Sequence, residues 1–152
     1  MSRKNFRRGI ECVFSDFSSI LNFFESISSR DWEEYHFKVV DYSIFSHGKR
    51  IDLPKEFSPF YIKQLVQQSF MCERLVLHLY SGKEDYQDID NFEDFLNSVC
   101  EMIILAYDCC YLEIYCKNQH WLEEILHAAH SIPGTIVVEK YADNDGRTSM
   151  YV

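Results

Sequence analysis

Glycine and proline are scarce in this sequence. Only 5 glycines and 3 prolines occur among 152 residues, which argues against long structureless loops. Long apolar runs are also missing, since none reaches the roughly 18 residues that a membrane helix needs. The first residues contain no apolar stretch followed by a small-residue cleavage site, so we expect no signal peptide. These absences predict a cytoplasmic protein that does not bind a membrane.

Basic residues are few outside the N-terminus. The formal net charge is −9, although the first eight residues, MSRKNFRR, carry four bases and no acid. From Gly9 onward, 11 bases face 24 acids, a difference of −13. Such a body repels phosphates, which argues against direct binding of nucleic acid and favours a basic protein partner. We predict that residues 1–8 form a basic tail and that residues 9–152 form a single domain.

Signatures of metal, cofactor and catalytic sites are absent. The six cysteines include no CxxC pair, so a zinc ribbon is disfavoured. Most of them lie in hydrophobic runs, where a reduced cysteine acts as a small buried residue. The sequence has no P-loop, GxGxxG, GxSxG or HExxH motif. His127 and His130 lie opposite the apolar face of one predicted helix and are expected to face water. We therefore expect no metal, no cofactor and no catalysis.

Hydrophobic periodicity predicts strands and helices in alternation. Strands are predicted at 8–14, 34–45, 72–80, 100–107, 110–117, 135–142 and 147–152, the last two forming a hairpin through residues 143–146. Helices are predicted at 15–27, at 58–68, after Asp90 and at 118–130. Both faces of the strand at 34–45 are apolar, so we expect it to be central or to contain a bulge near Val39–Val40. The order predicts an α+β domain: a single mixed, largely antiparallel sheet with about four helices packed mainly on one face.

Three stretches resemble a known family. Residues 88–129 contain FEDFLNSVCE, an apolar strand that ends in Asp108, and the pattern Y-x-x-I-Y-C-K at 111–117. The chain also has RGI at 8–10 and ADNDGRT at 142–148. Together these motifs resemble the bacterial domain-of-unknown-function family numbered 2691, small proteins of spore-forming Gram-positive bacteria. The resemblance implies a bacterial cytosolic protein, is consistent with the predicted fold and implies no catalytic residue.

Residues 82–101 form an acidic run with seven carboxylates and one base. Asp90 and Glu93 fit a helix start, with Asp90 as the cap. The run lacks the glycine and the spacing of a calcium loop. A tyrosine among carboxylates suits the groove of a basic partner. The predicted partner-binding residues are Glu84, Asp85, Tyr86, Asp88 and Asp94.

These features favour a small acidic, non-catalytic binding protein that docks on a basic protein, such as an inhibitor or an immunity protein that covers a toxin or nuclease. One alternative is a phage- or host-encoded regulator that mimics nucleic-acid charge. Another is a small enzyme whose site combines His36, Asp41 and His78, which requires these side chains to converge at the bottom of a pocket. The stretch RTSMYV, residues 147–152, is a candidate edge strand for homodimerisation.

Overall fold

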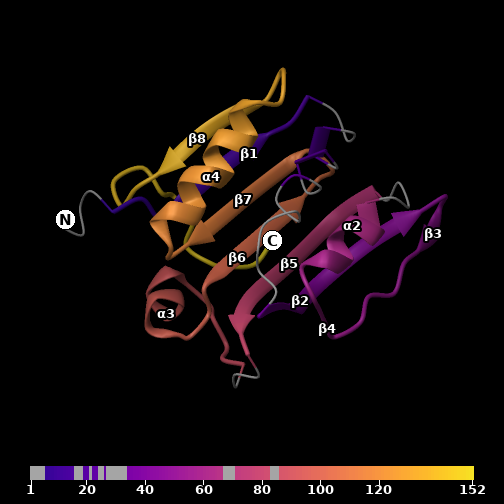
Figure 1. The fold of residues 1–152 in the computed structure, drawn as a ribbon, viewed down its shortest axis with the longest axis horizontal. Coiled ribbons are helices and arrows are strands. Elements are labelled where there is room, and N and C mark those ends of the chain that lie inside the picture. The colour runs from indigo at the N-terminus through magenta and orange to yellow at the C-terminus, as the bar shows by residue number, and fades with distance from the viewer. Residues whose placement is uncertain are drawn as a thin grey trace.

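The protein is built around one antiparallel sheet (Figure 1). The computed structural model describes residues 6–15, 19–20, 22–23, 26, 34–66, 71–82 and 86–152. The strands are β1 Gly9–Val13, β2 Tyr35–Ser46, β3 Lys49–Arg50, β4 Glu56–Phe57, β5 Met71–Ser81, β6 Met102–Tyr107, β7 Tyr111–Cys116 and β8 Ile136–Lys140. They form an eight-stranded sheet in the order β3-β2-β5-β6-β7-β1-β8, with β4 also paired to β2. Every pairing between described strands is antiparallel.

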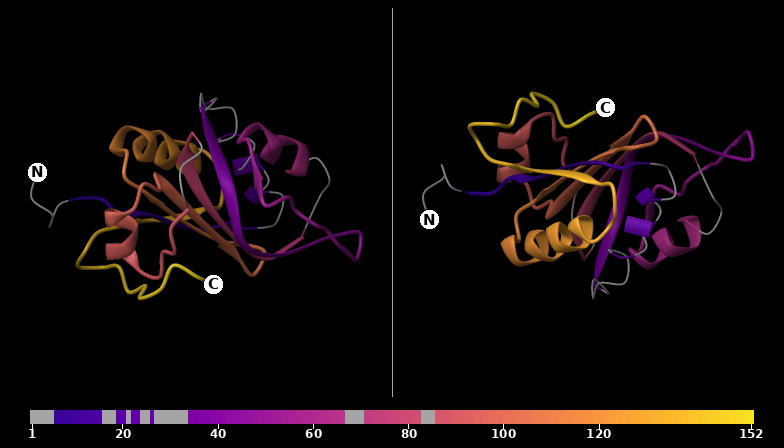
Figure 2. Two further views of the ribbon diagram at one scale, coloured as in Figure 1. Left: turned by 90° about the horizontal axis from the view of Figure 1, so that it is seen from below. Right: turned by 90° about the horizontal axis from the view of Figure 1, so that it is seen from above.

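Three helices are defined among the described residues, which corrects the predicted number of about four. They are α2 Phe60–Val66, α3 Phe92–Asn97 and α4 Gln119–His130. The helix predicted at 15–27 falls partly outside the described residues, and its described positions, 19–20, 22–23 and 26, are helical. Helices α2 and α4 cover one face of the sheet, whereas α3 and the C-terminal segment lie against the other (Figure 2).

Each face of the sheet carries its own hydrophobic core. The first core, on the α4 side, includes Leu77 of β5 and Leu122 of α4. The second core includes Val76 of β5, Phe95 of α3 and Met150 near the C-terminus. Successive side chains of a strand point to opposite faces, so β5 contributes to both cores. Its apolar character on both faces follows from this central position.

The predicted bulge in β2 is confirmed. The register of β2 against β5 shifts between Val39, which lies opposite Leu77, and Asp41, which lies opposite Val76. One residue of β2, Val40, is therefore extra relative to β5. A bulge of this kind bends a strand and changes which side chains share a face. As a result, Asp41 lies on the face of the second core.

The C-terminal segment corrects the predicted hairpin. Strand β8 ends at Lys140, and residues 141–152 contain no strand, so RTSMYV is neither a hairpin arm nor a sheet edge. Met150 is fully buried in the second core, and its backbone N–H donates to the carbonyl oxygen of Asp90 at 2.9 Å. An exposed hairpin arm would leave this methionine in water. Burial of its side chain therefore favours the path across the second face.

The start of α3 lies one residue later than predicted. The cap is Asn91, whose side-chain oxygen accepts from the backbone N–H of Asp94 at 2.9 Å. Asp94 in turn accepts from the backbone N–H of Asp90, the residue before the cap, at 3.1 Å, so each side of the helix start is hydrogen-bonded. The helix ends at Asn97, so Val99, which lies seven residues after Phe92 and would share its buried face in a longer helix, is 44% exposed.

Candidate functional site

The predicted partner-binding residues lie on the loop between β5 and α3 and on α3 itself. Glu84 and Asp85 fall outside the described residues. Tyr86, Asp88 and Asp94 are described, and we call residues 86–94 the acidic segment. These three side chains differ in exposure and in contacts, so they are not equivalent as candidates for binding.

The Tyr86 side chain packs against residues of the sheet. Its ring packs edge-on against Tyr80, with ring centroids 4.9 Å apart, and Lys38 Nζ lies 4.5 Å from the ring centroid. Its hydroxyl donates to a carboxylate oxygen of Glu56. Burial and then the bond to Glu56 raise the pKa of Tyr86. The side chain is nevertheless 36% exposed, so one side of the ring remains open to a partner.

The carboxylates of the acidic segment lack cationic partners within the described chain. Asp88, Asp90 and Glu93 are exposed, and Asp94 is half-buried because it stabilises the start of α3. None of the ion pairs between described residues includes any of these four. The described residues therefore leave the negative charge of this segment without an ion-pair partner.

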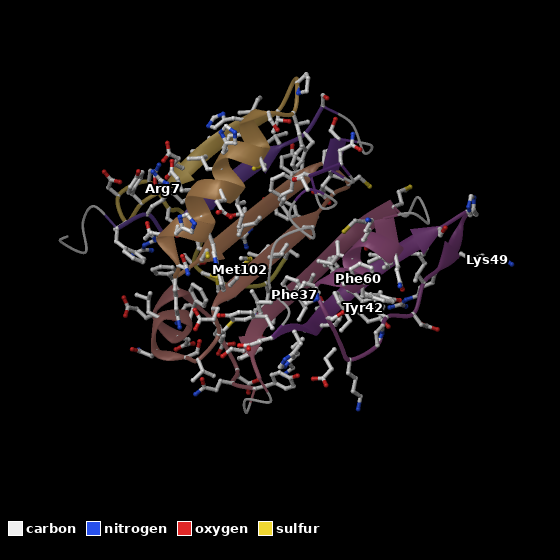
Figure 3. The ribbon with its side chains drawn as sticks, in the orientation of Figure 1. Arg7, Phe37, Tyr42, Lys49, Phe60 and Met102 are labelled. Carbon is white, nitrogen blue, oxygen red and sulfur yellow. The ribbon has the colours of Figure 1, made fainter. Side chains whose placement is uncertain are left out.

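Several basic side chains are instead engaged elsewhere in the chain. Arg7, beside α4 in Figure 3, pairs with Glu123 at 2.6 Å and with Glu139 at 2.8 Å. Lys117 Nζ donates to the carbonyl oxygen of Ser98 at 2.5 Å. The exposed lysines and arginines among the described residues all lie in the stretch from β3 to α2: Lys49, Arg50, Lys55 and Lys63. The same stretch also exposes Asp52 and Glu56, and its Glu56 accepts the hydrogen bond of Tyr86.

The residues of the enzyme alternative share one face of the sheet without forming a common site. His36, His78 and Asp41 all lie on the face of the second core, as their cross-strand partners show. Asp41 accepts from Arg74 Nε at 2.9 Å, and His36 Nε2 lies 3.9 Å from a carboxylate oxygen of Glu56. No hydrogen bond between described residues joins any two of the three.

His78 is enclosed rather than presented to a substrate. It is 2% exposed, and neither ring nitrogen has a hydrogen-bond partner among the described residues. Burial and then the positive charge of Lys38 lower the pKa of His78 to about 4. The imidazole is therefore neutral near pH 7, and its two unpaired nitrogens lower the stability of the fold.

A buried polar cluster under the C-terminal segment was missed by sequence reasoning. Glu113 of β7 is 2% exposed. It accepts from Arg147 Nε at 2.9 Å and from the Tyr107 hydroxyl at 2.9 Å, and Lys140 donates to the same carboxylate. We call the following set the Glu113 cluster: Arg8, Glu11, Tyr107, Glu113, Tyr115, Lys140, Asp145 and Arg147.

The charged groups of the Glu113 cluster pair with one another. Burial alone would raise the pKa of Glu113, but hydrogen bonds from Arg147 and Lys140 outweigh burial and lower it to about 2. Lys140 Nζ also lies 3.4 Å from a carboxylate oxygen of Asp145 and 3.8 Å from one of Glu11. A polar hollow of about 400 Å³ opens beside these groups. Because every charge already has an opposite partner, the cluster attaches the C-terminal segment to the sheet and leaves no free acid or base.

The family motifs contained a signal for this cluster. RGI supplies Arg8, which pairs with Asp145 at 3.4 Å. The motif at 111–117 supplies Tyr115, whose hydroxyl donates to Asp145 at 3.0 Å. The turn at the end of the chain supplies Asp145 and Arg147. Three motifs that are far apart in the sequence thus meet at one place on the second face.

Comparison with known proteins agrees with the resemblance drawn from these motifs. A family model described as "Protein of unknown function (DUF2691)" matches residues 61–151, more than half of the chain. The chain belongs to this family. It is also 34% identical over 64 residues to the uncharacterized protein YncE of Bacillus subtilis (strain 168), a match that spans 42% of each protein. No solved structure matches the chain.

The DUF2691 match covers most of the features described above. It begins in α2, includes the acidic segment, α3 and α4, and reaches the C-terminal segment with Arg147 and Met150. Strands β1 and β2 precede the matched region. None of the described helices is long and apolar enough to cross a membrane.

Proposed function

We propose that this DUF2691 protein is a small, acidic, non-catalytic binding protein that docks on a basic protein partner, in the manner of an inhibitor or an immunity protein. The observation that carries the proposal is the uncompensated charge of the acidic segment. Asp88, Asp90 and Glu93 are exposed and form no ion pair with any described residue. Exposed carboxylates of one sign steer a cationic partner toward the surface that bears them.

Two tyrosines border this charge. Tyr86 is 36% exposed and Tyr151 is 38% exposed. The N–H of Met150 donates to the carbonyl oxygen of Asp90 at 2.9 Å, which brings the neighbouring Tyr151 to the acidic segment. Burial, and then the charges of Asp90 and Asp88, raise the pKa of Tyr151. Tyrosine offers a rigid apolar surface with a polar tip, a combination that is common at the centre of protein interfaces. The surface therefore combines steering charge with aromatic contact area.

The pairing of the other ionisable groups supports binding over acid–base catalysis. A general base must reach a proton of its substrate. Glu113 is occupied by Arg147 and Lys140, Asp41 is occupied by Arg74, and His78 is buried. A regulator that mimics nucleic-acid charge stays an alternative, and duplex DNA that competes for the same partner would favour it.

The proposal is tested on the partner itself. The native protein is first used to capture partners from the host cytosol at low and high salt, and the salt-sensitive protein is identified. Association is then measured for a variant with Glu84→Ser, Asp85→Ser and Asp88→Ser. We expect association to slow by at least about tenfold at low salt, with little change in Tm.

A charge-matched control separates local from overall charge. The variant with Asp52→Ser, Asp143→Ser and Asp108→Asn also removes three acids, all of them exposed and away from the acidic segment. It should slow association much less. An association rate that is unchanged in the first variant, or reduced equally in both, would contradict docking at the acidic segment.

A further inference from the structure

The two ends of the sheet differ in how they are protected. At one end, β3 carries Lys49 and Arg50, both exposed, and charged side chains discourage pairing with another strand. At the other end, β8 pairs with β1 on one side, and no described strand covers its outer side. Its exposed side chains include Ile136 at 63% and Val138 at 44%. Strand β8 is therefore an apolar edge without the protection that β3 has.

The outer backbone groups of β8 can be assigned from two hydrogen bonds. The carbonyl oxygen of Lys140 accepts from the Arg8 N–H at 2.8 Å and so points toward β1. The carbonyl oxygen of Glu139 accepts from Asn144 Nδ2 at 2.9 Å on the outer side. Backbone groups alternate along a strand, so the N–H and C=O of Val137 also point outward. A second strand would find these two groups ready to bond.

We propose that two copies of this chain associate by antiparallel pairing of their β8 strands about a two-fold axis at Val137. In this register, Val137 lies opposite Val137 of the second copy, and their backbone groups form two hydrogen bonds. Ile136 lies opposite Val138 of the second copy, and the reverse pair forms by symmetry. Both apolar pairs lie on the second face, where these side chains are now exposed to water.

Charge favours this register over one centred on Glu139. With the axis at Val137, Glu139 lies opposite Thr135 of the second copy, so no two like charges face each other. An axis at Glu139 would place two glutamates in direct opposition, which is destabilising. The contact of Asn144 with Glu139 also limits how far pairing extends beyond that residue. The edge of β8 is therefore self-complementary over a short length.

The resulting dimer is weak. Strand β8 has five residues, and pairing over that length buries less than the roughly 1,200 Å² of a standard stable interface. Self-association should therefore depend strongly on protein concentration. The proposed dimer forms through β8 and not through RTSMYV. Its formation does not depend on docking at the acidic segment.

Sedimentation over a wide range of protein concentration tests the proposal. The mass of the native chain should rise from 18.1 kDa toward that of a dimer. Ile136→Lys, which puts a charge on the apolar edge, should weaken dimerisation at least about tenfold. Phe60→Lys is the matched control, because Phe60 is 61% exposed on α2 near the other end of the sheet (Figure 3). A native chain that stays monomeric, or an Ile136→Lys variant that dimerises like the control, overturns the proposal.

Disulfide trapping tests the register. The opposed positions 136 and 138 form a non-hydrogen-bonded pair with a Cα–Cα distance of about 4.5 Å, which a disulfide can span. An equal mixture of Ile136→Cys and Val138→Cys variants should cross-link with copper–phenanthroline and oxygen as oxidant. For each variant alone, the amount of cross-linked dimer should stay at that of the native chain, since the Cα atoms of the two introduced cysteines would lie more than about 7 Å apart. Equal linking by one variant alone, or none in the mixture, contradicts the register.

Discussion

Arg147 donates hydrogen bonds to the Glu113 carboxylate from two of its guanidinium nitrogens. Nε lies 2.9 Å from one carboxylate oxygen, and a terminal nitrogen donates to the other. The two residues are 34 positions apart, one on the C-terminal segment and the other in the middle of β7. Two parallel bonds between a guanidinium and a carboxylate fix orientation as well as distance. This pair therefore attaches the C-terminal segment to the sheet, together with the contacts of Asp145 to Tyr115 and Lys140.

Breaking this pair should destabilise the protein strongly. Arg147→Leu leaves Glu113 buried with Lys140 as its remaining cation, and we expect a loss of about 3 kcal/mol in the free energy of unfolding, measured by urea denaturation. Arg74→Leu is the control, because the Arg74–Asp41 pair is more exposed and should contribute about 0–1 kcal/mol. Equal losses in the two variants would mean that burial of Glu113 adds nothing.

The Glu113 pair also predicts an acid dependence of stability. The pKa of Glu113 falls from 4.5 to about 2 on folding, because Arg147 and Lys140 outweigh the effect of burial. A depressed carboxylate pKa contributes stability above 4.5 that is lost as the pH falls toward 2. In Glu113→Gln, the free energy of unfolding should therefore change less steeply across this interval. Urea denaturation at several pH values measures both slopes, and parallel curves would contradict the assignment.

His78 predicts a second dependence at higher pH. Its pKa falls from 6.5 to about 4 on folding, because burial and Lys38 disfavour the charged ring. The native state thus binds fewer protons, and stability should decline as the pH falls from 6.5 toward 4. His78→Leu should flatten this decline and raise the free energy of unfolding at pH 7 by about 1–3 kcal/mol, since it removes unpaired buried nitrogens. Exposed His127→Leu should change neither quantity, and the same flattening in that control would contradict the role of His78.

The close approach of β7 leaves no room for a side chain at Gly9, near the start of β1. A Cβ at this position would lie 2.0 Å from the carbonyl oxygen of Ile114, a backbone atom of the neighbouring strand. Gly9→Ala must therefore displace β1 from β7, and we expect a loss of about 3 kcal/mol or more, measured by thermal unfolding. Gly146→Ala meets no atom within 4 Å and should change stability by less than about 0.5 kcal/mol. Similar effects of the two substitutions would contradict a close approach of β1 and β7 at Gly9.

Local patterns predicted the central part of the fold. The strands β5, β6 and β7 follow from continuous apolar runs, and the start of α4 follows from Asn118, whose side chain accepts from the Trp121 N–H at 3.0 Å. The bulge near Val39–Val40 was one of two interpretations of the apolar residues on both faces of 34–45, the other being a central position in the sheet. Each of these features depends on residues within a few positions of one another.

The parts that sequence reasoning missed depend on distant partners. Glu113 resembles a solvent-facing residue of an alternating strand, and nothing near it in the sequence indicates that Lys140 and Arg147 neutralise it. Met150 belongs to a stretch that alternates like a strand, yet its amide bonds to Asp90. The composition predicted an acidic body, but the structure was needed to show that Asp88, Asp90 and Glu93 form no ion pair with any described residue.

The sequence by itself determined where β1, β2, β5, β6, β7 and β8 lie along the chain, the N-terminal cap of α4, the acidity of the body and the family, because these follow from short-range spacing and composition. The tertiary structure alone decided the path of the C-terminal segment, the second core and the Glu113 cluster. The ion pair of Glu113 with Arg147 and the burial of Met150 both depend on which strands lie side by side in the sheet. Long-range packing sets that arrangement.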